Sequence, residues 1–294
     1  MKNFYLLFAL LFVAGLCSQV AAQQPATETP PAFGIKLGGF VKVDYMFDSR
    51  QTVAPREGHF NLFPAAASKG ADGEDVNATP NFNMLAIQSR LKGTITAPDF
   101  FSAKTSGVIE GEFFGHTDAD INGFRLRHAF VKLDWAKSSL LFGQTWHPMF
   151  VAECYADVYN FNTGAPFQPF SRNPQIRFST KGKVKIIAAA MSQRDFASRG
   201  PNPSTGVAEQ SSAFLRNAVI PNLHGQLQFG NEKVTAGAGV DYKAIKPRLK
   251  DLKGNKTDET VAGLSYIAYL KVKAGKMTWK VEGTYGENLA DHIM

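Results

Sequence analysis

Hydrophobic and polar side chains alternate along most of the chain that follows residue 33. In the first such segment, Ile35, Leu37 and Val41 share one face, and Lys36 and Lys42 share the opposite face. A period of two places successive side chains on opposite sides of an extended backbone, so each segment is predicted to be a β-strand with one apolar face. Further segments with this pattern begin at Leu85, Ile109, Phe124, Leu223, Val234 and Met277.

Two of these segments lead to specific predictions. In the segment that begins at Leu85, the apolar face is expected to include Ile87 and Leu91. The segment that begins at Phe124 loses its alternation beyond Ala129, which implies either a β-bulge or a strand end outside the apolar band.

The connections between the segments alternate in length. The short ones follow Trp135 or include residues 181–183, 230–232 and 274–276, and the long polar ones include residues 49–80, 147–173, 194–219 and 245–258. A barrel in an outer membrane has short turns at its periplasmic rim and longer loops at its outer rim, whereas a soluble sandwich has no reason to collect its long loops at one end. The pattern therefore predicts an all-β fold, an antiparallel transmembrane β-barrel of the porin type.

The first 22 residues have the features of a secretory signal peptide. Lys2 precedes an apolar run over residues 4–16, and Val20 and Ala22 supply small residues three and one positions before a cut ahead of Gln23. Residues 23–33 are expected to form a flexible lead-in, and residues 34–294 to form the partial barrel. No later stretch reaches the roughly 18 consecutive apolar residues of a membrane-spanning helix.

Composition and motifs exclude several other functions. The formal net charge is +7, which is modest for 294 residues, and secretion argues against a nucleic-acid partner. Only Cys154 remains after cleavage, so an intramolecular disulfide is excluded. No GxSxG, HExxH or CxxC motif occurs and the histidines have no metal-ligand spacing, so neither an enzyme nor a cofactor or metal site is expected.

Ionisable residues on the polar faces are the candidates for a pore lining. Arg90, Arg125 and Arg127 lie on the second and fourth segments, and Glu110 and Glu112 lie on the segment between them. Cross-strand pairing could hold the guanidinium groups in one column whose field selects passing ions. The alternative is that these residues neutralise one another and leave no net field.

The long connection over residues 147–173 contains more aromatic residues than an exposed loop would keep. These are Phe150, Tyr155, Tyr159, Phe161, Phe167 and Phe170. They are expected to pack, and the barrel interior is the nearest apolar shelter, so the connection is predicted to fold inward. Glu153 and Asp157 would then face the arginines across the lumen. A trimer contact or a lid is the alternative role for these aromatics.

Four sequence blocks follow one another along the chain between residues 39 and 180. They are GFVKVDYMFDSR, RLRHAFVKLDW, LLFGQTWHP and RNPQIRFST. In this order they resemble blocks of DcaP-like trimeric outer-membrane porins. The resemblance implies a water-filled barrel in a homotrimer, contact with outer-membrane lipid, a constricting third loop, and passive uptake of small hydrophilic, often anionic solutes. It places Arg125 and Arg127 in a basic pore-wall segment, Gln144 where the chain leaves the wall, and Arg172 and Arg177 at its return.

The number of segments is smaller than such a barrel requires. About 11 strands can be counted, against about 16 in porins. The sequence also closes on Asp291 to Met294 rather than on the terminal aromatic residue that the resemblance implies, so a C-terminally truncated barrel is expected. A soluble periplasmic or surface β-protein that binds glycans or polyanions is the alternative, and dependence on detergent separates the two.

Overall fold

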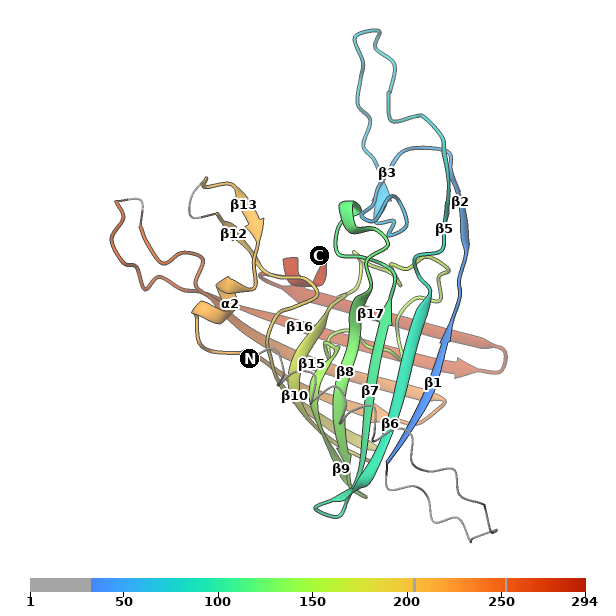
Figure 1. Cartoon of the computed structure of the whole chain (residues 1–294), viewed down its shortest axis with the longest axis vertical. Helices are drawn as coiled ribbons and strands as arrows, with labels where there is room; N and C mark the ends of the chain where they lie inside the picture. The colour runs from blue at the N-terminus through green and yellow to red at the C-terminus, as the bar shows by residue number, and fades with distance from the viewer. Residues whose placement is uncertain (1–32, 203–204, 252) are drawn as a thin grey trace, which may run out of the picture. The chain divides into compact units, whose positions relative to one another are not determined.

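An antiparallel sheet of 11 strands forms most of the computed structural model, which describes residues 33–202, 205–251 and 253–294 (Figure 1). The expected signal peptide and residues 23–32 of the lead-in lie outside the described residues. In spatial order the strands are β1 (Gly34–Phe40), β6 (Arg90–Phe100), β7 (Ala103–Glu112), β8 (Arg125–Asp134), β9 (Ser138–Trp146), β10 (Arg172–Thr180), β11 (Val184–Met191), β14 (Asn222–Gly230), β15 (Val234–Ile245), β16 (Val261–Ala274) and β17 (Met277–Gly286).

Shorter elements occupy the long connections between these strands. Three two-stranded sheets are present, and the helical elements are single turns or little more. The sheets pair β2 (Asp44–Asp48) with β5 (Asn81–Leu85), β3 (Thr52–Val53) with β4 (Phe63–Pro64), and β12 (Arg199–Pro201) with β13 (Ala208–Gln210). The helices are α2 (Ala213–Asn217) and the 3-10 turns η1 (Asp118–Asp120) and η2 (Ala290–His292).

The observed strand order confirms the predicted all-β antiparallel fold. Residues 101–102 join β6 to β7 and residues 181–183 join β10 to β11, whereas the connection from β1 to β6 contains four short strands. Figure 1 shows the turn after β6 at the bottom of the view and the excursion that carries β2, β3 and β5 at the top. Because β1 and β17 each pair with a single neighbour, the sheet is open within the described residues.

Apolar side chains cover the convex face of the sheet. Leu37 is 81% exposed, Ile176 54% and Trp279 60%, although each is large and apolar. Such a continuous exposed apolar surface is unusual for a protein surrounded by water, and a lipid-facing wall explains it. Over the described part of the chain, none of the helices is both long enough and apolar enough to cross a bilayer.

Ile87 does not lie on this outer face, so the prediction that it belongs to the apolar face of its segment was wrong. The backbone between β5 and β6 leaves the sheet in a turn that Ser89 closes by donating both its N–H and its hydroxyl to the carbonyl of Ala86. The alternation is interrupted there, so Ile87 turns inward and is only 3% exposed. Leu91, after the turn, is 58% exposed on the outer face as predicted.

A β-bulge explains the lost alternation in β8. Glu110 pairs with His128 and Gly111 pairs with Leu126, which leaves Arg127 as an extra residue in β8. Arg127 and His128 are consequently both buried, 3% and 9% exposed, on the concave side. The phase of the strand is reversed beyond this point, and Lys132 joins the concave face.

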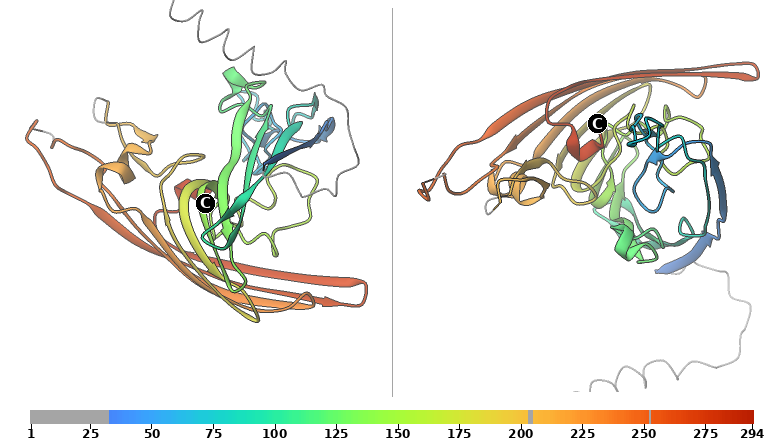
Figure 2. Two further views of the ribbon diagram at one scale, coloured as in Figure 1. Left: turned by 60° about the horizontal axis from the view of Figure 1, so that its bottom comes forward. Right: turned by 90° about the horizontal axis from the view of Figure 1, so that it is seen from above.

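The connection between β9 and β10 lies on the concave side of the curved sheet (Figure 2). Phe150, Phe161 and Phe170 of this connection form a buried cluster with Phe60 and Phe114. A second cluster packs Met149, Val151 and Cys154 against Ile267 and Tyr269 of β16. Two of the aromatic residues that were expected to pack do not, because Tyr159 is 96% exposed and Phe167 is 84% exposed.

Candidate functional site

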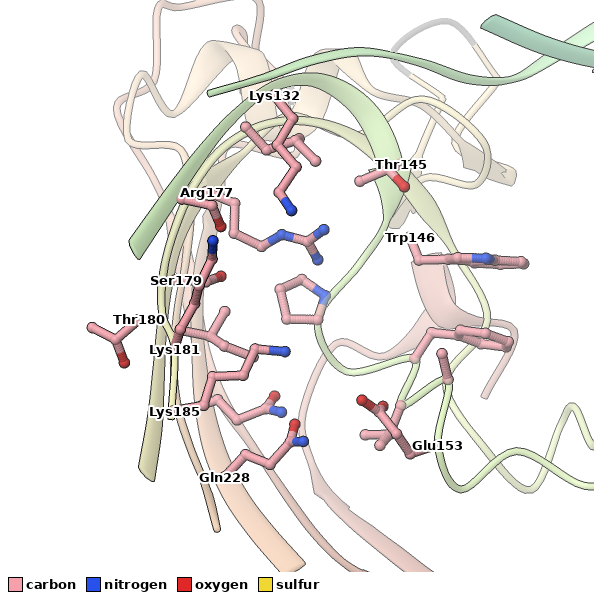
Figure 3. A pocket seen from close by; sticks show the side chains of 18 of the residues that line it. Lys132, Thr145, Trp146, Glu153, Arg177, Ser179, Thr180, Lys181, Lys185 and Gln228 are labelled. Carbon is pink, nitrogen blue, oxygen red and sulfur yellow. The ribbon is translucent and has the colours of Figure 1, made fainter. Parts of the chain in front are cut away.

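A basic pocket lies between the concave face of the sheet and the start of the connection that follows β9. Its volume is about 520 Å³, and Figure 3 shows it from close by. The wall supplies Lys132 from β8, Arg177 from β10, Lys185 from β11 and Lys181 from the turn between β10 and β11. Trp146, Pro148 and Glu153 are among the residues that line the opposite side.

Strand register explains why these basic residues gather. Lys132 and Arg177 are both paired with Leu141 of β9, on either side of it, so the three side chains form one row across the sheet. Ser179 follows Arg177 at a spacing of two and therefore points to the same side. Figure 3 shows Arg177 and Lys185 directed toward the side of the pocket that carries Glu153.

The basic residues of the pocket are only partly neutralised. Asp134 forms ion pairs with Lys181 and Lys132, with distances of 2.7 Å and 3.3 Å between its carboxylate oxygens and the lysine Nζ atoms. Within the described residues, Arg177 and Lys185 have no ion pair. Four cations thus line this pocket together with one acidic residue, Glu153, while Asp134 lies next to it, and the field inside the pocket is positive.

A second group of arginines is buried around one carboxylate. Glu112 is 0% exposed and accepts hydrogen bonds from three guanidinium groups. The donors are Arg90 Nε at 2.9 Å, Arg125 Nη2 at 2.7 Å and Arg127 Nη1 at 2.8 Å. Glu110 pairs with Arg127 Nε at 2.8 Å. These pairs are the mutual neutralisation considered from the sequence as the alternative to a column with a net field.

Asp195 and Arg172 complete this cluster. Arg172 Nη2 lies 2.8 Å from Asp195 Oδ2, and Arg125 Nη1 lies 3.4 Å from Oδ1. Burial alone would raise the pKa of Asp195, but the charges of Arg172 and Arg125 outweigh it, and the pKa lies below its usual value. Asp195 is therefore an anion that anchors the connection after β11 to the wall.

Aromatic rings cover the buried arginines. The guanidinium carbon of Arg125 lies 5.5 Å from the ring centre of Phe161, and that of Arg127 lies 5.8 Å from it. The guanidinium carbon of Arg172 lies 5.7 Å from the ring centre of Phe170. These cation–π contacts join the connection after β9 to the wall, in addition to its apolar packing.

A smaller pocket lies beside this cluster. It has a volume of about 410 Å³, and Lys42, Arg90 and Arg127 supply its cations. Trp146 and Phe150 line both pockets and stack with ring centres 3.9 Å apart, so the two rings form a shelf between the pockets.

The structure separates the ten residues predicted to line a pore into groups. Arg177 and Glu153 line the basic pocket, and Arg90 and Arg127 line the smaller one. Gln144 is 8% exposed and donates to the carbonyl oxygens of residues 126 and 127, and Asp157 pairs with Lys280 at 2.7 Å. The others, Glu110, Glu112, Arg125 and Arg172, belong to the buried arginine cluster.

Sequence reasoning missed three cations of the basic pocket. Lys132 lies beyond the bulge, so its face could not be read from the alternation before Ala129. Lys181 and Lys185 lie in and after a short turn, where lysines are common and usually point to solvent. The available signal was the spacing of two between Arg177, Ser179 and Lys181 on a strand that leads directly into that turn.

Comparisons with known proteins support the fold. No protein-family model and no curated protein matches the chain. Among solved structures, the outer membrane channel DcaP of Acinetobacter baumannii matches with a TM-score of 0.63 and 19% identity over 90% of this chain. Outer-membrane expressed OmpT of Vibrio cholerae matches with a TM-score of 0.47 and 10% identity over 89% of this chain.

The chain spans 66% of the length of the DcaP channel and 67% of that of OmpT. The sheet with its alternating connections and the match to DcaP agree with the resemblance of the sequence blocks. The chain therefore has the fold of an outer-membrane channel, and its likeness to DcaP-like porins holds at the level of that fold.

Proposed function

We propose that this chain forms the wall and the constriction of an outer-membrane channel for passive diffusion of small hydrophilic, anionic solutes. The observation that carries the proposal is the basic pocket on the concave face, where Arg177 and Lys185 have no ion pair with any described residue and Glu153 faces them. A lumen with an excess of fixed positive charge raises the local concentration of anions and lowers that of cations.

The placement of charge across the pocket supports solutes that are polar as well as anionic. Cations line the wall and Glu153 lies on the connection, so the field runs across the path of a solute. Such a field orients dipolar molecules and penalises apolar ones, because an apolar molecule must displace water from charged groups without replacing its hydrogen bonds.

The exposed convex face supports a location in a membrane. Its large apolar side chains favour a lipid-facing wall over the alternative of a soluble β-protein that binds glycans or polyanions. We place the protein in the outer membrane as a homotrimer. It arrives there after a signal peptide is cleaved ahead of Gln23. N-terminal sequencing of the protein from membranes tests the cleavage, and its mass in detergent tests the trimer.

The reversal potential in a salt gradient tests the selectivity. Protein extracted from outer membranes is inserted into a planar bilayer that separates two concentrations of KCl. A channel lined by this pocket is expected to give a reversal potential of the sign for anion preference. A preference for cations, or extraction without detergent, would contradict the proposal.

A further inference from the structure

Two histidines and one aspartate of the kinds that can bind a metal are buried together, away from the basic residues that line the two pockets. His147 follows β9, His224 lies on β14 and Asp241 lies on β15. They are 0%, 4% and 3% exposed, and one ligand atom from each lies within 4.8 Å of the others. His224 and Asp241 are direct partners in the antiparallel register, which explains how residues 17 apart come together.

A chain of hydrogen bonds leads from Tyr269 to His224. Tyr269 Oη donates to Gln228 Oε1 at 3.1 Å and accepts from Gln226 Nε2 at 2.8 Å. The Gln226 amide is thereby oriented with Oε1 toward His224 Nε2, 3.0 Å away. His224 therefore donates from Nε2, and a neutral ring presents the lone pair of Nδ1 on its other side.

That lone pair faces a carboxylate. His224 Nδ1 lies 3.2 Å from Asp241 Oδ2. Either a proton on Nδ1 or a metal ion can lie between these two atoms, and in the second case both atoms act as ligands. The other oxygen, Asp241 Oδ1, accepts from Asn222 Nδ2 at 2.6 Å. Outer contacts of this kind orient the ligands in metal sites.

His147 approaches the same carboxylate oxygen. Its Nε2 lies 3.4 Å from Asp241 Oδ2 and 3.1 Å from Asn222 Oδ1, and its Nδ1 accepts the N–H of Met149 at 3.1 Å. To bind a metal through Nε2, His147 must release the proton from that nitrogen, as metal binding to protonated ligands generally requires. The ring then carries its proton on Nδ1, and Met149 loses its acceptor.

His292 supplies an independent indication of a ligand. It is 0% exposed, its ring centre lies 4.5 Å from that of His147, and neither ring nitrogen has a hydrogen-bond partner within the described residues. The neighbouring Asp291 is engaged by Lys243 and by Gln193, and its Oδ2 lies 3.9 Å from His292 Nε2, which is beyond hydrogen-bond distance. Buried imidazole nitrogens without partners are uncommon, and a ligand bound beside His147 would satisfy one of them.

We propose that His147, His224 and Asp241 bind a divalent transition-metal ion such as Zn²⁺. Two imidazoles and one carboxylate form a donor set that suits Zn²⁺ better than Mg²⁺ or Ca²⁺, which prefer oxygen ligands. The filled site connects the end of β9 with β14 and β15. Because Met149 lies near the start of the connection that lines the basic pocket, occupancy of the site also changes how that connection is held.

Zinc binding to the chelator-stripped protein in detergent tests the proposal. Calorimetry and metal analysis near neutral pH are expected to give about one Zn²⁺ per chain. Cobalt in place of zinc is expected to give visible absorption bands, because a tetrahedral Co²⁺ site with nitrogen ligands absorbs in this range.

Three variants and a control locate the site. H224Q and D241N each remove a ligand and are expected to weaken binding by about 100-fold or more, whereas Q226L removes only the partner of His224 Nε2 and is expected to weaken it by about 10-fold or more. H116Q, which changes an exposed histidine, is expected to bind as the parent does. Heat-modifiable migration in gels shows that each variant is folded.

Two results would overturn the proposal. One is a stripped protein that takes up fewer than about one Zn²⁺ per ten chains, and the other is parental affinity in folded H224Q, D241N and Q226L. If zinc is absent and ¹⁵N spectra show a proton on Nδ1 of His224, a proton lies between His224 and Asp241. The metal site is then refuted, and the proposed channel is not affected.

Discussion

The influence of a basic residue on a passing solute depends on the carboxylates around it. Arg125 and Arg127 are enclosed by Glu110, Glu112 and Asp195, so their charges are largely compensated before any solute arrives. Arg177 and Lys185 have no such partners within the described residues and line an open pocket. At the scale of single residues, the latter two are expected to determine ion preference.

The double variant R177Q/K185Q is expected to lose most of the anion preference. Two of the four cations disappear from the basic pocket, while Asp134 and Glu153 remain, so the fixed charge there approaches zero. The reversal potential in a KCl gradient should move toward zero. K104Q, which changes a lysine whose side chain is 83% exposed in an ion pair with Asp99, should leave it unchanged. An unaltered potential in R177Q/K185Q would place the selective charges elsewhere.

At the scale of structural elements, the connection after β9 is the part that narrows the concave side. It carries one wall of the basic pocket, and it is held by apolar packing and by its own aromatic rings, which lie over arginines of the wall. Phe161 contributes to both kinds of contact, since it stacks on Phe114 with ring centres 4.1 Å apart and lies over Arg125 and Arg127.

Replacing Phe161 with alanine is expected to loosen this connection. Removal of a buried phenylalanine costs about 3–5 kcal/mol in a packed core, and here the loss falls on the contacts that hold the connection. Single-channel recordings should show a larger and noisier conductance, and a protease should cut the connection faster. Y159A removes an aromatic ring that is 96% exposed on the same connection and should behave as the parent. Equal effects in both variants would rule out anchoring by Phe161.

The connection after β11 is expected to give the fold a dependence on acid. The pKa of Asp195 is lowered in the folded state from its ordinary value of 3.8, so this carboxylate stabilises the fold above that value. The contribution is lost as the pH falls through the lowered folded-state pKa. The free energy of unfolding should therefore be smaller for D195N than for the parent at pH 7, and the difference should shrink below about pH 4.

Urea unfolding of the detergent-solubilised protein at both pH values provides the measurement. E259Q breaks the exposed pair with Arg248 and should change the free energy of unfolding by less than about 1 kcal/mol. A difference between D195N and the parent that does not vary with pH would mean that Asp195 acts through packing and not through its charge.

At the scale of the whole described chain, the two faces of the sheet suit different environments, one apolar and one polar. The convex face carries exposed apolar residues, and the concave face carries the ion pairs, amides and histidines. An arginine on the lipid-facing side of a transmembrane strand costs about 2–4 kcal/mol near the bilayer midplane. Ile176 lies near the middle of β10 and is 54% exposed on the convex face, so it is the position at which this asymmetry is best measured.

I176R is expected to reduce stability in lipid vesicles by about this amount, whereas S179R on the concave face of the same strand should have little effect, because its side chain enters a wet pocket. The free energies of unfolding of the two variants in vesicles give the comparison. Equal losses would indicate that the convex face does not contact hydrocarbon.

The sequence alone was sufficient to predict the strands of the large sheet and the alternating lengths of their connections. A period of two follows from the geometry of an extended backbone, and the alternation of short and long connections follows from chain topology, so both are visible in one dimension. The pattern failed at Ile87 and beyond Ala129, where a turn and a bulge interrupt the ladder. Local interruptions of this kind depend on how a strand meets its neighbours, which the pattern does not contain.

Only the tertiary structure decides which charged side chains pair with one another. The sequence places arginines and glutamates on neighbouring strands, but whether a guanidinium meets a carboxylate or open space depends on register and on the connection that covers it. Glu112 pairs with four arginines in this way, whereas Arg177 has no ion pair within the described residues. His147, His224 and Asp241 converge from positions far apart in the chain, because antiparallel pairing across several strands brings distant residues to one depth of the wall.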